Sequence, residues 1–336
     1  MITVNYIVRN GERDIRLFLD SLKNQTLQQS SGQASFKVNV WDNNSSDSTP
    51  DIVRKEYPEF ELHESKENIG VWAAFEKLVN ADKGSKYVIC MTDVILDKDF
   101  LEKAINLMEQ NPDAGALQAK IYQTGTKIID TCGFKVFKSR KVINLGQGET
   151  DTGQYDSLHE IFATEGAVPV FRKEALEDCR VEGHIIDPDY RIGPLGYGDD
   201  LDLAWRMRLF GWKHLFAQNV IAYHNRSTTK SYSNNLKDYL ARTKERQKID
   251  IIKRRLDWRN TIFTIIKNDY IINILKDLLY VIFREIGVLG YVVLFEPGVL
   301  KEVGNFIKYL PKMLKRRRKV IRRAKLTHGE LRKWFQ

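Results

Sequence analysis

Three aspartates lie close together in the segment Gly196–Arg206, which reads GYGDDLDLAWR. Asp199, Asp200 and Asp202 stand at the start of a run in which apolar residues recur at helical spacing. Carboxylates are common at this place because the helix dipole favours negative charge at a helix N-terminus. They are also suited to general-base catalysis, since adjacent carboxylates separate in pKa and one of them can then accept a proton. The local sequence leaves both interpretations open.

Two further aspartates follow predicted strands. Asp42 comes directly after the apolar stretch Val38–Trp41, and Asp93 comes just after Tyr87–Met91. Asp42 could accept hydrogen bonds from a nucleobase or a ribose. Asp93 could bind a hard divalent cation that bridges a diphosphate, because such cations prefer oxygen ligands. Aspartate is equally common in turns and helix caps, so each residue taken alone is also compatible with a structural role.

Other residues with chemical potential are more isolated. His224 lies in the segment IAYHNRS and, as a neutral imidazole, could complete a metal site, although a single histidine is more often a core or surface residue. Glu165 could face an acceptor or act as a structural carboxylate beside Gly166. Trp72 and Trp205 are expected in the core rather than as platforms for sugar rings.

The elements that must position these residues alternate between strand-like and helix-like segments. Such an order predicts an α/β fold with a mainly parallel sheet and flanking helices. Ligands of these sheets bind at the carboxyl ends of the strands, where Arg9, Asp42 and Asp93 fall. The predicted strands are Ile2–Val8, Phe36–Trp41 and Tyr87–Met91, and the predicted helices are Asp14–Leu22, a helix that begins at Pro50, Val71–Ala81 and Phe100–Gln110.

Positive charge is concentrated in the last third of the chain. The 336 residues contain 53 Lys and Arg against 44 Asp and Glu, and 43% of them are hydrophobic, which excludes a disordered chain. Residues 226–336 hold 27 of the basic and 10 of the acidic residues, a balance of +17, whereas residues 1–225 have a balance of −8. The three cysteines form no CxxC pair, which predicts small buried side chains and a reducing compartment.

The C-terminal third combines apolar and basic segments. Asn234–Arg259 is charged and predicted to be helical, and Ile262–Phe295 predicts an amphipathic helix or hairpin because charges recur among its apolar residues. The longest late apolar run, Ile286–Phe295, has ten residues and is too short to span a bilayer, and the N-terminus does not predict a signal peptide. With the basic run Lys315–Lys319, these features favour association with an anionic membrane surface. Nucleic-acid binding and a solvated tail or oligomer contact are the alternatives.

Taken in order, the motifs resemble those of family 2 glycosyltransferases with the GT-A fold, a Rossmann-like α/β architecture. They are NGE after the first strand, VWDNNSSDST, ENIG, CMTDV, GYGDDLDLAWRMRLFGW and YHNRS. The bacterial rhamnosyltransferase-like branch is the most similar, because DTCGF, GQGETDTGQYD and TEGAVPVFR within Ile128–Arg172 also resemble it. The resemblance implies a GT-A domain over residues 1–230, followed by a helical, basic, membrane-associating region over residues 231–336.

The resemblance implies inverting transfer of a hexose or rhamnose from a nucleotide-sugar donor to a hydroxyl group. The acceptor would be a glycan or a polyprenyl-diphosphate-linked glycan in cell-surface polysaccharide synthesis, at the cytoplasmic face of the membrane. The segment Met91-Thr92-Asp93 keeps only the last aspartate of the family's DxD metal motif. By position, the resemblance assigns Asp200 as the catalytic base with Asp199 as its acidic neighbour, Arg9, Asp42, Asn68 and Gly70 to the donor site, and Asp93 and His224 to Mn²⁺ or Mg²⁺.

Other classes of protein remain as alternatives. A catalytically inactive nucleotide-sugar-binding or scaffolding subunit of a glycan assembly complex is consistent with the incomplete DxD motif, although the Asp199-Asp200 pair opposes it. A sugar-phosphate nucleotidyltransferase is disfavoured because Asn10-Gly11-Glu12 is not a glycine-rich phosphate loop. Nucleic acid is disfavoured as a partner, because its binding would use only the basic run and not the apolar segments. An oligomer is compatible with the sequence.

Overall fold

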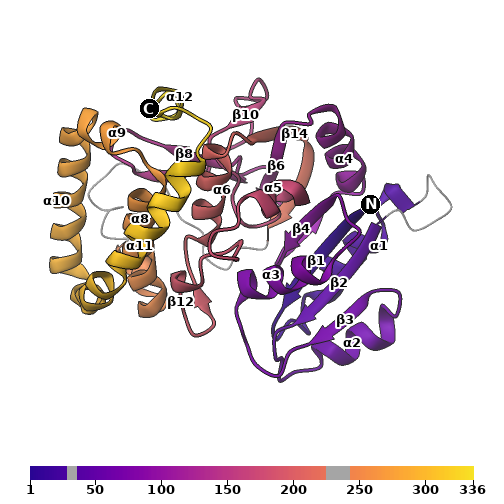
Figure 1. Cartoon of the computed structure of the whole chain (residues 1–336). Coiled ribbons are helices and arrows are strands. Elements are labelled where there is room, and N and C mark those ends of the chain that lie inside the picture. Colours follow the sequence, from indigo (N-terminus) through magenta and orange to yellow (C-terminus); the bar gives the residue numbers. More distant parts are fainter. Residues whose placement is uncertain (29–35, 225–242) are drawn as a thin grey trace.

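A computed structural model describes residues 1–28, 36–224 and 243–336 (Figure 1). Its centre is a mixed, mostly parallel sheet with the strand order β10-β14-β6-β11-β4-β1-β2-β3. β1 pairs in parallel with β2 and β4, β2 with β3, and β6 with β14, while β11 runs antiparallel between β4 and β6. The predicted α/β fold is confirmed. These strands are β1 (Ile2–Val8), β2 (Phe36–Asp42), β3 (Glu61–Glu64), β4 (Tyr87–Met91), β6 (Ala114–Gln123), β10 (Glu160–Ile161), β11 (Val170–Arg172) and β14 (Lys213–His224).

Helices cover both faces of the sheet. The apolar side chains of β1 alternate, with Val4 and Tyr6 in the same cluster as α1, α2 and α4, and Ile7 in the cluster of α3, α5 and α6. The predicted bounds of α3, β4 and α4 agree with the structure, because a buried apolar pattern of the correct period defines each of them. The helices are α1 (Ile15–Lys23), α2 (Thr49–Glu56), α3 (Val71–Ala81), α4 (Phe100–Gln110), α5 (Lys173–Asp178) and α6 (Asp199–Leu209).

Short strands between β4 and α6 extend the sheet and add two small hairpins. β5 pairs with β14 and β7 with β6, while β8 pairs with β9 and β12 with β13. Each has only two or three residues, too few to show a period in the sequence. They are β5 (Val94–Leu96), β7 (Ile129–Thr131), β8 (Phe134–Val136), β9 (Val142–Asn144), β12 (Arg191–Ile192) and β13 (Leu195–Gly196), with the short 3₁₀ helices η1 (Thr26–Gln28) and η2 (Pro188–Tyr190).

The C-terminal helices pack against the sheet domain through buried ion pairs. Lys267 Nζ lies 2.6 Å from Asp187 and 2.9 Å from Asp202 of α6. Asn260 donates hydrogen bonds to the carbonyls of Tyr190 and Tyr197. Part of the predicted helix Asn234–Arg259 lies outside the described residues. The helices are α8 (Ile251–Asn268), α9 (Ile271–Lys276), α10 (Leu278–Phe295), η3 (Pro297–Glu302), α11 (Val303–Arg323) and α12 (His328–Arg332).

One C-terminal helix differs from the prediction. α10 is a single helix of 18 residues with a mean hydropathy of 2.0, which is enough by length and composition to cross a membrane. The prediction began the apolar run at Ile286, after Arg284 and Glu285, but in the structure these two side chains pair with each other and one helix contains both of them and the run. The three cysteines are free and buried, as predicted.

Candidate active site

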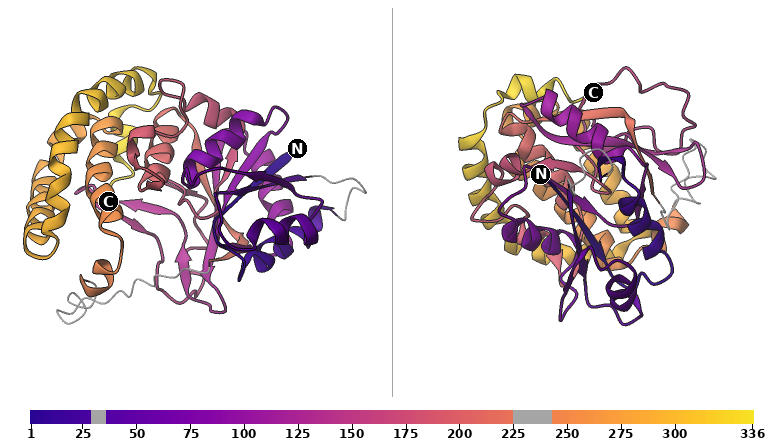
Figure 2. Two further views of the ribbon diagram at one scale, coloured as in Figure 1. Left: turned by 90° about the horizontal axis from the view of Figure 1, so that it is seen from below. Right: turned by 90° about the vertical axis from the view of Figure 1, so that its right-hand side faces the viewer.

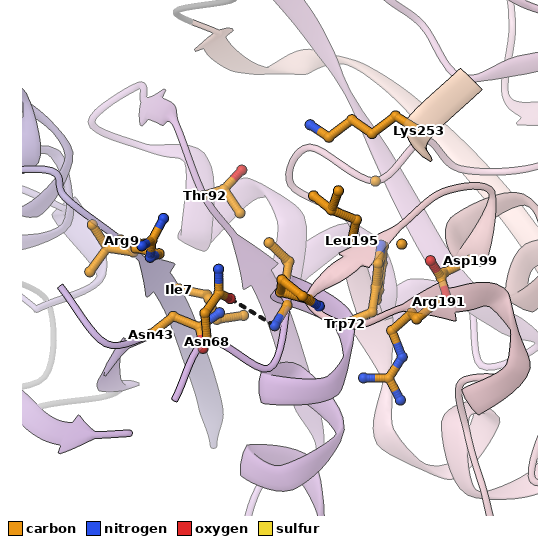
Figure 3. A pocket seen from close by; sticks show the side chains of 16 residues that line it. Ile7, Arg9, Asn43, Asn68, Trp72, Thr92, Arg191, Leu195, Asp199 and Lys253 are labelled. Carbon is orange, nitrogen blue, oxygen red and sulfur yellow. Dashed lines mark hydrogen bonds between the residues drawn. The ribbon is translucent and has the colours of Figure 1, made fainter. Parts of the chain in front are cut away.

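A pocket of about 360 Å³ opens at the carboxyl ends of β1, β2 and β4 (Figure 3). Its position agrees with the general rule for ligands of open α/β sheets. Of the residues that the sequence assigned, Arg9, Asn68, Gly70 and Asp199 line it directly. The remaining lining residues are Ile7, Val8, Asn43, Val71, Trp72, Thr92, Gly166, Arg191, Pro194, Leu195, Gly196 and Lys253.

The first turn of α6 brings the carboxyl group of Asp199 to one wall of this pocket, while Asp200 does not line the pocket itself but lies next to Gly166 of the same wall. Asp199 is buried, and neither of its carboxyl oxygens has a hydrogen-bond partner among the described residues. Burial, together with the charge of Asp200, raises the pKa of Asp199 well above its usual value. The carboxyl group of Asp199 therefore holds its proton more tightly than that of an exposed aspartate, and it lies at the wall of the pocket.

Asp200 has a different environment. Burial, together with the charge of Glu165, raises its pKa to about 7. Its side chain lies against the pocket wall, because a Cβ atom added to Gly166 would be 3.0 Å from Asp200 Oδ2. The backbone N–H of Leu201 donates to Asp200 Oδ1 at 2.8 Å, which fixes the carboxyl group. A carboxylate that exchanges its proton near pH 7 is suited to general-base catalysis.

Asp93 and His224 lie side by side at the end of β4 and the end of β14. His224 Nε2 is 3.1 Å from Asp93 Oδ1, and His224 Nδ1 is 2.9 Å from Asp130 Oδ2. Thr92, which lines the pocket, donates to Asp93 Oδ1 at 2.7 Å. Burial would raise the pKa of Asp93, but the hydrogen bond and charge of His224 outweigh it and hold the pKa at about 2.

The chemistry of Asp93, His224 and Asp130 fits a divalent cation. When the Nδ1–H of a neutral His224 donates to Asp130, Nε2 turns a lone pair toward the carboxylate of Asp93. Two such atoms can stay 3.1 Å apart only with a proton or a cation between them. A carboxylate that orients a metal-binding histidine from behind is also a common arrangement. No group of three or more potential metal ligands occurs within the described ranges, and Asp93 and His224 are the two side chains that the sequence assigned to a cation.

The loop that precedes α3 is held against β2 and against the β12–β13 hairpin. Asn43 Oδ1 accepts a hydrogen bond from the backbone of Ile69 at 2.9 Å, and Asn68 Oδ1 accepts one from Gly70 (dashed line in Figure 3). Gly70 has a φ of +82°, and a Cβ atom there would lie 2.4 Å from the carbonyl oxygen of Pro194. Gly70 is thus needed for the close contact between the two loops that form opposite walls.

Asp42 lies beneath this loop rather than on the pocket surface. It is buried, its Oδ2 accepts from the backbone of Ser45 at 3.0 Å, and its Oδ1 has no partner in the part of the chain that the structure describes. The first contact is that of a turn, and the second oxygen is buried, so this structure does not present Asp42 to a donor in the pocket.

Three cationic side chains face the pocket from different elements. Arg9 follows β1, Arg191 belongs to β12, and Lys253 comes from the first turn of the helix α8 (Figure 3). Only Arg9 was predicted. Lys253 was missed because the sequence assigned its segment to a separate membrane-associating region, yet α8 packs on α6 and on both strands of the β12–β13 hairpin.

The tryptophans have different roles. Trp205 is fully buried in the core, as predicted. Trp72 is half-buried and lines the pocket, so it is placed to contact a ligand. Glu165 accepts a hydrogen bond from the backbone of Ala167 and acts on Asp200 through its charge.

Comparisons with known proteins agree with this geometry. Residues 3–158 match the sequence model of Glycosyl transferase family 2. S. aureus TarS 1–349 in complex with UDP-GlcNAc has a TM-score of 0.57 at 15% identity, and the match covers 99% of this chain and 90% of that chain. GalNAc-T7 with UDP, GalNAc and Mn²⁺ has a TM-score of 0.52 at 12% identity over 73% of this chain. The chain spans 47% of GalNAc-T7 and 43% of a longer TarS structure. A comparison with curated proteins found no match.

Proposed function

We propose that the protein is an inverting, cation-dependent nucleotide-sugar glycosyltransferase. The match of residues 3–158 to family 2 glycosyltransferases and the GT-A fold of the chain support this proposal. The observation that carries the proposal is the pair of carboxyl groups at the start of α6. Asp200 has a pKa of about 7, while burial raises the pKa of its neighbour Asp199 well above the usual value of an aspartate. A scaffolding protein has no need for a carboxylate with such a pKa at the wall of its ligand pocket.

Asp200 is the general base in this proposal. It removes the proton of the acceptor hydroxyl while the hydroxyl oxygen attacks the anomeric carbon from the face opposite to the leaving nucleoside diphosphate. The bond to the acceptor oxygen forms as the bond to the diphosphate oxygen breaks, which inverts the anomeric centre. The carboxyl group of Asp199 and the indole of Trp72 contact the sugar between the two loops.

The leaving diphosphate gains negative charge as its bond breaks. Arg9, Arg191 and Lys253 face the pocket and stabilise this charge as donors of charged hydrogen bonds. Asp93 and His224 would hold a Mn²⁺ or Mg²⁺ ion, which supplies Lewis-acid stabilisation of the leaving group without proton transfer. Asp130 keeps the ring of His224 in place for this task.

The donor, the branch and the acceptor are finer parts of the proposal. TarS 1–349 and GalNAc-T7 are solved with UDP or a UDP-sugar, so we propose uridine nucleotides as the first donors to test. The DTCGF and TEGAVPVFR segments support the rhamnosyltransferase-like branch. The basic, apolar C-terminal region supports a polyprenyl-diphosphate-linked or other glycan acceptor of cell-surface polysaccharide synthesis, at the cytoplasmic face of a membrane.

Thermal stabilisation by nucleoside diphosphates and nucleotide sugars tests the proposal. We expect one nucleotide family to stabilise the protein in Mn²⁺ or Mg²⁺ but not in chelator, by ~2.7 kcal/mol at about 100 times its Kd. Asp93→Ala should lose the cation dependence, whereas Asp200→Asn should bind as the wild type does. Absence of a response to every nucleotide, in a folded protein, would contradict the proposal. Donor binding without turnover across acceptors would favour the scaffolding alternative.

A further inference from the structure

The apolar surface of the molecule is concentrated on three consecutive helices. Of the 19 exposed large hydrophobic residues in the described chain, 15 lie between Ile271 and Leu314. Leu279, Phe283 and Leu294 are each at least 70% exposed, which is unusual for a soluble surface. α10 carries most of these residues and lies at the edge of the molecule away from α1 and α2 (Figures 1 and 2).

The exposed face of α10 contains no charge. At 100° per residue, the exposed positions cover somewhat more than half of the helix surface, and all of them are apolar or glycine. Arg284 and Glu285 fall on the opposite side, where they pair with each other. The exposed apolar positions are Leu278, Leu279, Tyr280, Ile282, Phe283, Ile286, Leu289, Val293 and Leu294, and Ile271, Ile272 and Leu275 of α9 precede them.

Both ends of α10 are fixed to the rest of the molecule. Asp277, directly before the helix, is fully buried and pairs with Arg140 and Arg332. Glu296, directly after it, is also buried and pairs with Arg246 at 3.0 Å. Since these ion pairs hold both ends of the helix, α10 cannot turn away to cross a bilayer without breaking them. It is arranged to lie along a surface.

Between positions 271 and 323, the exposed charged residues are all basic. Every acidic residue between positions 271 and 323 pairs with an arginine, and those other than Glu285 are buried. Part of the basic run is used inside the molecule, because Arg316 is buried against Asp187, Asp189 and Glu182. Of the exposed basic residues in this stretch, Lys312, Lys315, Lys319 and Arg323 also pair with Asp189, Glu182 or Asp178, while Lys276, Lys301, Lys308, Arg318 and Arg322 form no ion pair with the described residues.

We propose that the exposed face of α9 and α10 lies in the plane of an anionic lipid bilayer, with the lysines and arginines of α11 against the lipid headgroups. An uncharged apolar face beside a stripe of exposed positive charge is complementary to such an interface, which is apolar below and negative at its surface. α11 follows α10 through η3, and its own apolar residues Val303, Ile307 and Leu314 lie along one edge of its basic stripe. This inference rests on the proposed location at a membrane and identifies the surface that makes the contact.

The same helical region also contributes to the active site. Lys253 lines the donor pocket from α8, and α8 packs directly against α11 and η3. A membrane bound along α10 would therefore lie at a fixed orientation relative to the pocket. This arrangement is suited to an acceptor whose lipid part stays in the bilayer.

Flotation of the full chain with lipid vesicles tests the inference. We expect the wild type to bind vesicles of phosphatidylcholine with 30 mol% phosphatidylglycerol, and to bind pure phosphatidylcholine at least tenfold more weakly. The double variant Leu279→Ser/Phe283→Ser should lose at least tenfold in binding to the anionic vesicles. Leu17→Ser is the matched control, because Leu17 is also an exposed leucine, 53% accessible, but belongs to α1.

A second pair of variants tests the charge. Arg318→Gln/Arg322→Gln should weaken binding severalfold at low salt and reduce its salt dependence, since each basic residue near an anionic surface contributes ~1 kcal/mol, about a fivefold change. Thermal stabilisation by nucleotide should be unchanged in all these variants, which separates failure of this inference from failure of the proposed transfer.

Three results would overturn the inference. Vesicle binding by Leu279→Ser/Phe283→Ser at the wild-type level would exclude the apolar face of α10 as the contact. A dimer of the wild type that becomes monomeric in this variant, without vesicle binding, would show that a second copy covers the face. Protein that stays in the vesicles after a wash in alkaline carbonate would indicate a spanning helix rather than one in the plane.

Discussion

Replacement of the proposed base should make the protein more stable. The pKa of Asp200 is about 7 in the folded state, against an ordinary value of 3.8 for an aspartate side chain. The unfolded chain therefore releases this proton more readily, and the carboxyl group destabilises the fold increasingly as the pH rises from about 4 to about 7. The difference of about three pKa units corresponds to about 4 kcal/mol of unfolding free energy above pH 7.

Asp200→Asn removes this cost while it keeps the shape of the side chain. The amide oxygen can still accept the hydrogen bond from Leu201. With an unfolding entropy of about 2.1 cal/mol/K per residue, 4 kcal/mol corresponds to a rise in Tm of about 6 °C at pH 8. At pH 4 the variant and the wild type should have nearly equal Tm values, because Asp200 is then protonated in the folded state.

Thermal unfolding of both proteins between pH 4 and pH 8 measures this effect. Asp93→Asn is the control of opposite sign, since the pKa of Asp93 is lowered to about 2 and its removal should destabilise the protein above pH 4. A Tm of Asp200→Asn that is equal to or below the wild-type value at every pH would refute the assignment of a raised pKa to Asp200, and with it the argument for the base.

Three further predictions follow from the site. The transfer rate at limiting donor should rise with pH through an apparent pKa of about 7, as initial rates measured between pH 5.5 and 9 would show. Glu165→Gln should move this rise to lower pH, because it removes the negative charge that raises the pKa of Asp200. A rise at the same pH in this variant would contradict the role of Glu165. Lys253→Met should weaken nucleoside diphosphate binding about tenfold in calorimetric titration, with Lys248→Met, an exposed lysine just before α8, as an unaffected control. Asp130→Asn should raise the Mn²⁺ concentration for half-maximal activity by ~10–100-fold, with wild-type turnover restored at saturating Mn²⁺. If this concentration is unchanged, Asp130 does not orient His224 for metal binding.

The sequence predicted a helix or strand correctly where the residues of that element alone determine its structure. α3, β4 and α4 follow their apolar patterns, and Pro50 lies in the first turn of α2 as its fixed φ predicts. The order of the motifs was enough to place Arg9, Asn68, Gly70 and Asp199 at one pocket, because the carboxyl ends of parallel strands meet at one edge of a sheet.

The rest depended on contacts between distant segments. Lys253 reaches the pocket only because α8 packs against α6, and Asp130 reaches His224 only because β7 pairs with the same sheet, 94 residues away in sequence. The ion-pair partners of the basic run could not be predicted either, since Arg316 pairs with acidic residues that lie more than 120 positions earlier in the sequence. A local pattern gives the charge of a segment but not the partner that neutralises it.

Turnover by Asp200→Asn tests the central claim most directly. Nucleoside diphosphate release and glycosylated product should be measured with the donor that stabilises the wild type, after the variant has been shown to be folded and to bind the same donor. The account predicts unchanged donor binding and a rate reduced by at least 10²-fold, in keeping with the loss of a general base. Full transfer activity in the folded Asp200→Asn protein would contradict it.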